Sequence, residues 1–166
     1  MRQVLHSNRW QLEHFLARAK DEAGFSFAGK KVALAGLAFK QDTNDMRHSG
    51  AIHIIEHLMQ KGAAEIKVFD PAAMSVCRTL FPASSGQDGS ISYHDSSEAI
   101  LADADCLFIA TDWPEFRELG ETISKLCQPP FLIMDGRRMI ESQYSELANK
   151  GFTIIAVGSP LYGPHC

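Results

Sequence analysis

The chain has 166 residues, of which 45% are hydrophobic and 22% are charged, and it carries a formal net charge of -4 at pH 7. This length and this apolar share suffice for one packed core, so we expect a single domain. The acidic balance argues against nucleic acid as a partner, because proteins that bind a phosphate backbone usually carry a basic surface.

The first predicted element is a helix over residues 3–23, ended by Gly24. Its apolar residues recur at helical spacing and form one stripe: Val4, Leu5, Leu12, Phe15, Leu16 and Ala19. An apolar stripe must be covered. We therefore predict that this helix packs against another chain or a crystal neighbour rather than wholly on its own sheet.

From Lys30 onward, apolar runs of strand length alternate with segments of helical spacing. We predict strands at 31–36, 65–71, 91–94, 106–111, 130–136 and 152–158. We predict helices at 48–61, 72–80, 96–103, just after Trp113, and at 141–150. The polar, turn-rich segment "PASSGQDGS" is expected to be a mobile surface loop.

Strands such as "VALAG", "CLFIAT" and "FTIIAV" are almost continuously apolar, which is typical of parallel strands with helices on both faces of the sheet. The expected fold is therefore α/β, a doubly wound, mainly parallel, Rossmann-like sheet of strand order 3-2-1-4-5-6, with a long N-terminal helix. In such sheets ligands bind at the carboxyl ends of the strands. The loops expected there are "GLAFKQDTND", "FDPAA", "ATDW", "DGRRM" and "GSPLYG".

The loop after the first strand resembles a nucleotide site, but it lacks the three glycines of a dinucleotide fingerprint. Only Gly36 is present, so NAD is not expected across this turn. Lys40 and Arg47 offer positive charge to a phosphorylated ligand instead. The alternative is that both are solvated charges, paired with Asp42 and Asp45.

Other chemistry-bearing residues fit packing roles better. His53 and His57 share a helix face, but the sequence H-E-x-x-H is absent, so no metal site is expected. The cysteines form no C-x-x-C pair and are expected to be free thiols, mostly in the core: Cys77, Cys106, Cys127 and Cys166.

For two residues at strand ends the sequence allows two alternative roles each. Trp113 either stacks on a base or packs the edge of the cleft. Asp70 lies where Rossmann proteins place a ribose-binding acid, but in "DP" it is also suited to cap the following turn.

Several strings agree in order and distance with one family: "GLAFKQDTNDMRHS", "VFDP", "ATDWPEF" and "DGRRM". Over residues 1–158 the chain resembles the C-terminal, UDP-binding domain of the UDP-glucose 6-dehydrogenases, in the UDP-glucose/GDP-mannose dehydrogenase family. The resemblance implies an NAD-dependent oxidoreductase that converts UDP-glucose to UDP-glucuronate for polysaccharide biosynthesis. Residues 1–28 would be the end of the central connecting helix and a linker, and 29–166 the sugar-nucleotide-binding domain.

The resemblance also implies roles for single residues. Phe39 and Lys40 would contact the substrate, with Lys40 near the sugar and phosphates, and Arg138 would be a substrate-binding arginine. Arg47 would reach the pyrophosphate of NAD. Asn8 and Gln11 match an N-x-x-Q region of the long helix, without an assigned role.

The catalytic parts of the family are missing from this sequence, which has neither G-F-G-G-x-C nor G-x-G-x-x-G. No catalytic residue is therefore assigned, and the chain alone is expected to be inactive, with NAD bound mainly by another domain. The alternatives are a stand-alone nucleotide-binding or interaction module, and the same domain from a family member that uses another UDP- or GDP-sugar.

Nothing in the sequence indicates export or membrane insertion. There is no run of about 18 apolar residues, and "MRQVLHSNRW" does not have the form of a signal peptide. We therefore expect a cytoplasmic protein without a membrane partner. The resemblance implies a homodimer or larger assembly of the full-length enzyme.

Overall fold

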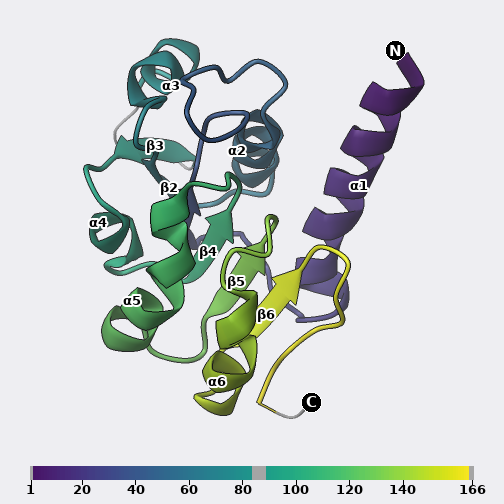
Figure 1. The fold of residues 1–166 in the computed structure, drawn as a ribbon, viewed down its shortest axis with the longest axis vertical. Helices are drawn as coiled ribbons and strands as arrows, with labels where there is room; N and C mark the ends of the chain where they lie inside the picture. Colours follow the sequence, from purple (N-terminus) through teal and green to yellow (C-terminus); the bar gives the residue numbers. More distant parts are fainter. Residues whose placement is uncertain (1, 84–88, 165–166) are drawn as a thin grey trace.

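The computed structural model describes residues 2–83 and 89–164, and side chains from Arg9 onward (Figure 1). The loop predicted to be mobile falls mainly on residues 84–88, which lie outside the described residues. Across the described ranges no helix is both long enough and apolar enough to cross a bilayer.

The strands and helices alternate as the sequence predicts. The strands are β1 (Lys31–Ala35), β2 (Glu65–Phe69), β3 (Ser90–Tyr93), β4 (Cys106–Ile109), β5 (Leu132–Asp135) and β6 (Thr153–Ala156). The α-helices are α1 (Arg2–Asp21), α2 (Gly50–Gln60), α3 (Met74–Leu80), α4 (Ser97–Leu101), α5 (Leu119–Leu126) and α6 (Tyr144–Asn149). Two 3₁₀ turns, η1 (Pro114–Glu118) and η2 (Glu141–Gln143), lead into α5 and α6.

The six strands form one sheet of order β3-β2-β1-β4-β5-β6, and every pair of neighbours is parallel. This confirms the predicted fold class and strand order. All residues of β4 and β5 are buried, which explains their continuously apolar sequences. Because the strands are parallel, the loops that follow β1, β2, β4, β5 and β6 meet at one edge of the sheet.

Helices cover both faces of the sheet (Figure 1). On one face, α4 contacts α5 and α5 contacts α6. On the other face, α1 lies beside the start of α2, where the side chain of Leu12 approaches Gly50. Phe27 packs between β4 and α2, against the rings of Phe108 and His57. His57 is therefore a packing residue, as expected.

The second half of α1 lies on the domain, whereas the side chains of residues 2–8, with Val4 and Leu5 of the predicted stripe, lie outside the described residues. Phe15, Leu16 and Ala19 are buried in the common core, whereas Trp10 is 66% exposed and the first turns of the helix extend away from the sheet (Figure 1). Part of the predicted apolar stripe is thus covered by the chain's own domain. The expectation that another chain covers the rest stays a prediction.

The segment "GSPLYG" differs from its predicted place in one respect. After Ser159 the chain turns back along β6, where Tyr162 pairs with Ile154 in an antiparallel bridge through two backbone hydrogen bonds. The Tyr162 ring lies beside that of Tyr144 in α6. Only Gly158 and Ser159 of this segment therefore belong to the carboxyl edge, because Tyr162 pairs with Ile154 on the open side of β6.

Candidate functional site at the carboxyl edge of the sheet

Asp70 follows β2 and organises the centre of this edge. Its carboxylate is buried and accepts hydrogen bonds from five donors. Oδ2 accepts from the backbone N–H of Leu37 and Ala38 and from Nε1 of Trp113, at 2.7, 3.0 and 3.0 Å. Oδ1 accepts from the N–H of Ala72 and Ala73, both at 2.8 Å. Both oxygens are therefore occupied by the protein itself.

These contacts decide the two roles that the sequence left open. Asp70 caps the turn that follows β2, as one alternative held, and also holds the first turn after β1. Trp113 is only 8% exposed and uses its indole N–H on Asp70, so it packs the edge of the site. Neither side chain is free to contact a ligand in this arrangement.

The first turn after β1 is closed to a phosphate. In a dinucleotide fold the backbone N–H groups of this turn face the pyrophosphate. Here the N–H groups of Leu37 and Ala38 donate to Asp70. The turn therefore lacks the glycine fingerprint and also lacks free N–H groups at Leu37 and Ala38, where a dinucleotide fold would bind the pyrophosphate.

The loop after β1 also packs tightly against the loop after β4. Gly36 has φ of 98°, and a Cβ placed there would lie 2.6 Å from the side chain of Thr111. The Thr111 hydroxyl donates to the carbonyl of Ala38 at 2.7 Å, and the Ser49 hydroxyl donates to that of Leu37 at 2.7 Å. A glycine is required at this crossing, and the turn is held from both sides.

A second buried carboxylate fixes the loop after β5. Asp135 accepts from the backbone N–H of Arg137, Met139 and Ile140, each at 3.1 Å, and from the Tyr144 hydroxyl at 2.7 Å. Burial, together with the nearby Asp135 carboxylate, raises the pKa of Tyr144, so this phenol remains a donor. The backbone that carries the two arginines of "DGRRM" is therefore held firmly.

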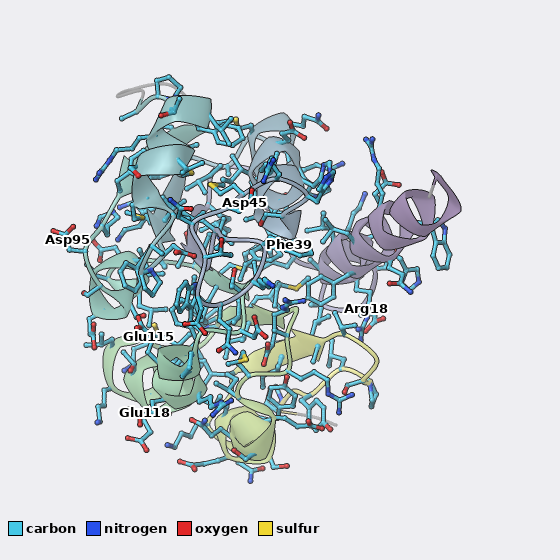
Figure 2. All side chains as sticks on the ribbon, turned by 45° about the horizontal axis from the view of Figure 1, so that its top comes forward. Arg18, Phe39, Asp45, Asp95, Glu115 and Glu118 are labelled. Atoms are coloured by element: carbon cyan, nitrogen blue, oxygen red, sulfur yellow. The ribbon has the colours of Figure 1, made fainter. Side chains whose placement is uncertain are left out.

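Phe39 lies on the solvent side of these anchored turns (Figure 2), and the next residue, Lys40, is exposed as well. The Phe39 ring is 50% exposed, and its backbone N–H donates to the carbonyl of Asp45 at 2.8 Å. Lys40 is exposed and takes part in none of the ion pairs formed among the described residues. The two predicted substrate contacts thus present an apolar ring and a free cation on one short stretch.

Arg47 lies in the same loop, paired with Asp45 as one alternative held. The guanidinium donates to both Asp45 oxygens at 2.8–3.1 Å, and the Arg47 backbone N–H donates to Oδ1 at 2.8 Å. These bonds lower the pKa of Asp45 to about 2. The Arg47 side chain is still 85% exposed, so a ligand can reach its other face.

We expect the Asp45 carboxylate to titrate near the pH given by that pKa, about 2. A depressed pKa means that the pair stabilises the loop above the ordinary carboxyl value of about 3.9, and that this contribution is lost as the pH falls through about 2. Carbon-detected NMR titration of the side-chain carboxyl measures it. Arg47→Met should return the midpoint toward its ordinary value, and an ordinary midpoint in the unmodified chain would contradict the pair.

The arginines after β5 point to different partners. Arg137 pairs with Asp112 at 3.5 Å, and Asp112 also accepts the Gln41 backbone N–H at 3.3 Å. Arg138 has φ of 55° and pairs with Glu141. The loop that bears Lys40 is thus tied through Asp112 to Arg137, the neighbour of the predicted contact Arg138. The sequence reasoning missed Arg137 and Asp112, although "DGRRM" and "ATDW" contain both.

The three cysteines in the described ranges are packing residues. Cys77, Cys106 and Cys127 are free and buried, and burial raises the pKa of each thiol, that of Cys127 to about 11. Gln11 is exposed on α1, and the side chains of Asn8 and Cys166 lie outside the described residues. Within the described ranges no cluster of side chains is suited to hold a metal ion.

Comparison with known proteins identifies the family. The model of the UDP binding domain of the UDP-glucose/GDP-mannose dehydrogenase family matches residues 33–142, which include Asp70 and the loops that carry Lys40 and Arg138. The chain belongs to this family. The resemblance seen in the sequence motifs is thereby confirmed.

Full-length relatives agree over nearly the whole chain. UDP-glucose 6-dehydrogenase of Mus musculus is 36% identical over 168 aligned positions, which cover 96% of this chain and 34% of the mouse protein. The enzyme of the same name from Caenorhabditis elegans is 33% identical and covers 94% of this chain and 33% of its own length. The chain thus spans about a third of the length of these oxidoreductases.

Solved structures share both the fold and the family. A UDP-glucose dehydrogenase from Pyrobaculum islandicum superposes with a TM-score of 0.66 at 26% identity, over 84% of this chain and 29% of that one. A UDP-D-ManNAc dehydrogenase from Pyrococcus horikoshii gives 0.62 at 27% identity, over 89% and 30%. The same architecture therefore occurs in family members named for different sugars.

Proposed function

We propose that the chain is the sugar-nucleotide-binding part of an NAD-dependent UDP-glucose 6-dehydrogenase, which oxidises UDP-glucose to UDP-glucuronate. The observation that carries this proposal is the match of the UDP-binding family model across both cationic loops of the carboxyl edge. Residues 29–166 form the binding domain, and residues 1–28 are the end of the connecting helix and a linker. The full-length enzyme is a cytoplasmic homodimer or larger assembly that supplies polysaccharide biosynthesis.

In this proposal Phe39, Lys40 and Arg138 bind the substrate. The turn N–H groups of Leu37 and Ala38 are engaged by Asp70, so recognition of a diphosphate falls to side chains. Lysine supplies a compact charge and arginine a planar fork that matches phosphate oxygens. The exposed ring of Phe39 offers an apolar surface next to that charge. Arg138 must share or leave Glu141 when the ligand binds.

NAD does not fit this chain as a primary site. The first turn has a single glycine, and its N–H donors face Asp70 rather than open space. We infer that NAD is bound mainly by another domain, with Arg47 as the one contact from this chain. The role of this chain is then to bind and orient the sugar nucleotide, while the oxidation takes place on groups that lie in the rest of the enzyme.

A second family substrate is kept as an alternative. The Pyrococcus horikoshii structure, named for UDP-D-ManNAc, is as similar in sequence as the Pyrobaculum islandicum one. A UDP-N-acetylhexosamine would use the same diphosphate contacts and differ at the sugar. A stand-alone nucleotide-binding or interaction module is the other alternative.

Titration calorimetry of the chain with UDP tests the proposal. We expect saturable binding of UDP and weaker binding of UMP, because loss of one phosphate removes an anionic group that Lys40 and Arg138 would contact. ADP serves as the control for the base. Absence of heat with UDP, or equal affinity for ADP, would contradict a UDP site on this domain.

A further inference from the structure

Arg18, in the last turns of α1, joins this helix to the loop at the carboxyl end of β6 (Figure 2). Its Nη1 donates to the carbonyl of Ala156 at 2.7 Å, and its Nη2 donates to the carbonyl of Ser159 at 2.8 Å. The guanidinium also forms a two-pronged pair with Glu22, at 2.7 and 2.9 Å. One side chain thus satisfies two carbonyls at the carboxyl end of β6 and a carboxylate just after its own helix.

The setting of Arg18 differs from that of an ordinary surface arginine. Its side chain is only 11% exposed. Arg9 on the same helix also pairs with a glutamate four residues later, but its side chain is 66% exposed and that of Glu13 is 62% exposed. An exposed pair of this kind contributes little, whereas a largely buried guanidinium that bonds to backbone carbonyls fixes geometry. Arg18 is therefore built into the contact between α1 and the domain.

The loop held by Arg18 also lies against Arg138. Gly158 is in the left-handed region, with φ of 70°, and a Cβ placed there would lie 3.8 Å from Nη1 of Arg138. The backbone of residues 156–159 thus contacts Arg18 on one side and lies next to the Arg138 guanidinium at Gly158. A movement of this loop would change the space that the Arg138 side chain occupies.

We propose that Arg18 is a positioning residue, which ties the direction of helix α1 to the β6 loop and, through this loop, to Arg138. The part that concerns ligand binding rests on the proposed role of Arg138. The buried side chains of α1, among those described from Arg9 onward, lie in its second half, and the bonds of Arg18 in that half restrict the angle of the helix to the sheet. The direction of the helix and the arginine of the nucleotide site are then coupled.

Three variants of the chain test this coupling. Arg18→Met keeps the apolar stem and removes every donor, and Arg18→Lys keeps the charge but not the planar fork. Arg9→Met is the matched control, because it removes an arginine from the same helix without a contact to the domain. Amide hydrogen exchange of residues 136–140 and 156–159 is measured first without nucleotide. UDP affinity is then measured by calorimetry.

We expect Arg18→Met to raise exchange at residues 156–159 and 138 while β1 and β4 keep their protection. UDP affinity should fall by about five- to tenfold, in the range set by loss of charged hydrogen bonds. Arg18→Lys should recover part of both effects, and Arg9→Met should change neither. Unchanged exchange and affinity in Arg18→Met, or equal effects in Arg9→Met, would overturn the proposal.

The two arms separate this inference from the proposed function. If the unmodified chain does not bind UDP, the proposed function fails. The hydrogen-exchange measurement then tests by itself whether Arg18 holds the β6 loop. If Arg18→Met does not fold, Arg18→Lys provides the same two readouts. Raised exchange at 156–159 with unchanged affinity would overturn the coupling to Arg138.

Discussion

Asp70→Asn should lower the free energy of unfolding by about 3 kcal/mol, the largest loss that we expect from a single isosteric change in this chain. One carboxylate oxygen accepts three N–H donors and the other accepts two. An asparagine places an NH₂ group at one of these positions, whichever way the amide is turned. At least two buried donors then lose their acceptor, and each such loss costs about 1–3 kcal/mol. Urea denaturation followed by Trp fluorescence measures this loss.

The control is the same substitution at Asp95, which is exposed after β3 and accepts none of the hydrogen bonds found in the described part of the chain (Figure 2). Asp95→Asn should stay within about 0.5 kcal/mol of the unmodified chain. Because Asp70 also holds the turn before Lys40, Asp70→Asn should weaken UDP binding as well. Equal stability of the two variants would mean that Asp70 does not organise the site.

Lys40→Ala and Arg138→Ala should each weaken the binding of UDP by roughly ten- to a hundredfold. Removal of one charged contact to a ligand costs about 1.5–3 kcal/mol, which corresponds to this range of affinity. In the full-length enzyme Arg47→Ala should mainly weaken the binding of NAD. Calorimetry on the single variants provides the affinities, and the unfolding free energy of each variant shows that the fold is intact.

Two further variants sharpen this test. Lys125→Ala removes an exposed lysine of α5 that pairs with Glu121, and it should leave UDP affinity unchanged. Arg137→Ala breaks the pair with Asp112 and shows which of the adjacent arginines the ligand uses. Unchanged UDP affinity in both Lys40→Ala and Arg138→Ala would mean that these residues are solvated loop charges and no binding site.

The sequence predicts the sheet because each strand and each helix can be recognised from the apolar pattern of its own residues. Continuously apolar strands separated by helical segments allow few parallel arrangements, and right-handed crossovers place the loops at one edge. The candidate residues Phe39 and Arg138 follow instead from the resemblance of motifs such as "GLAFK" and "DGRRM" to those of the family.

The contacts that fix the site could not be predicted, since they join residues far apart in the sequence. Asp70 bonds to Trp113 across 43 positions, and Arg18 bonds to Ala156 across 138. Sequence spacing does not reveal which way such side chains point. The return of Tyr162 along β6 was missed for the same reason, because nothing in "GSPLYG" signals an antiparallel partner.

Amide chemical-shift mapping of the chain during titration with UDP tests the central claim most directly. If the carboxyl edge binds the nucleotide, the largest shifts will fall in the loops after β1, β4 and β5, with Phe39, Lys40 and Arg138 among them. Lys40→Ala should reduce these shifts at equal UDP concentration. Shifts that cluster elsewhere, for example between α5 and α6 around Lys125 and Lys150, or no shifts at millimolar UDP, would contradict a nucleotide site at this edge.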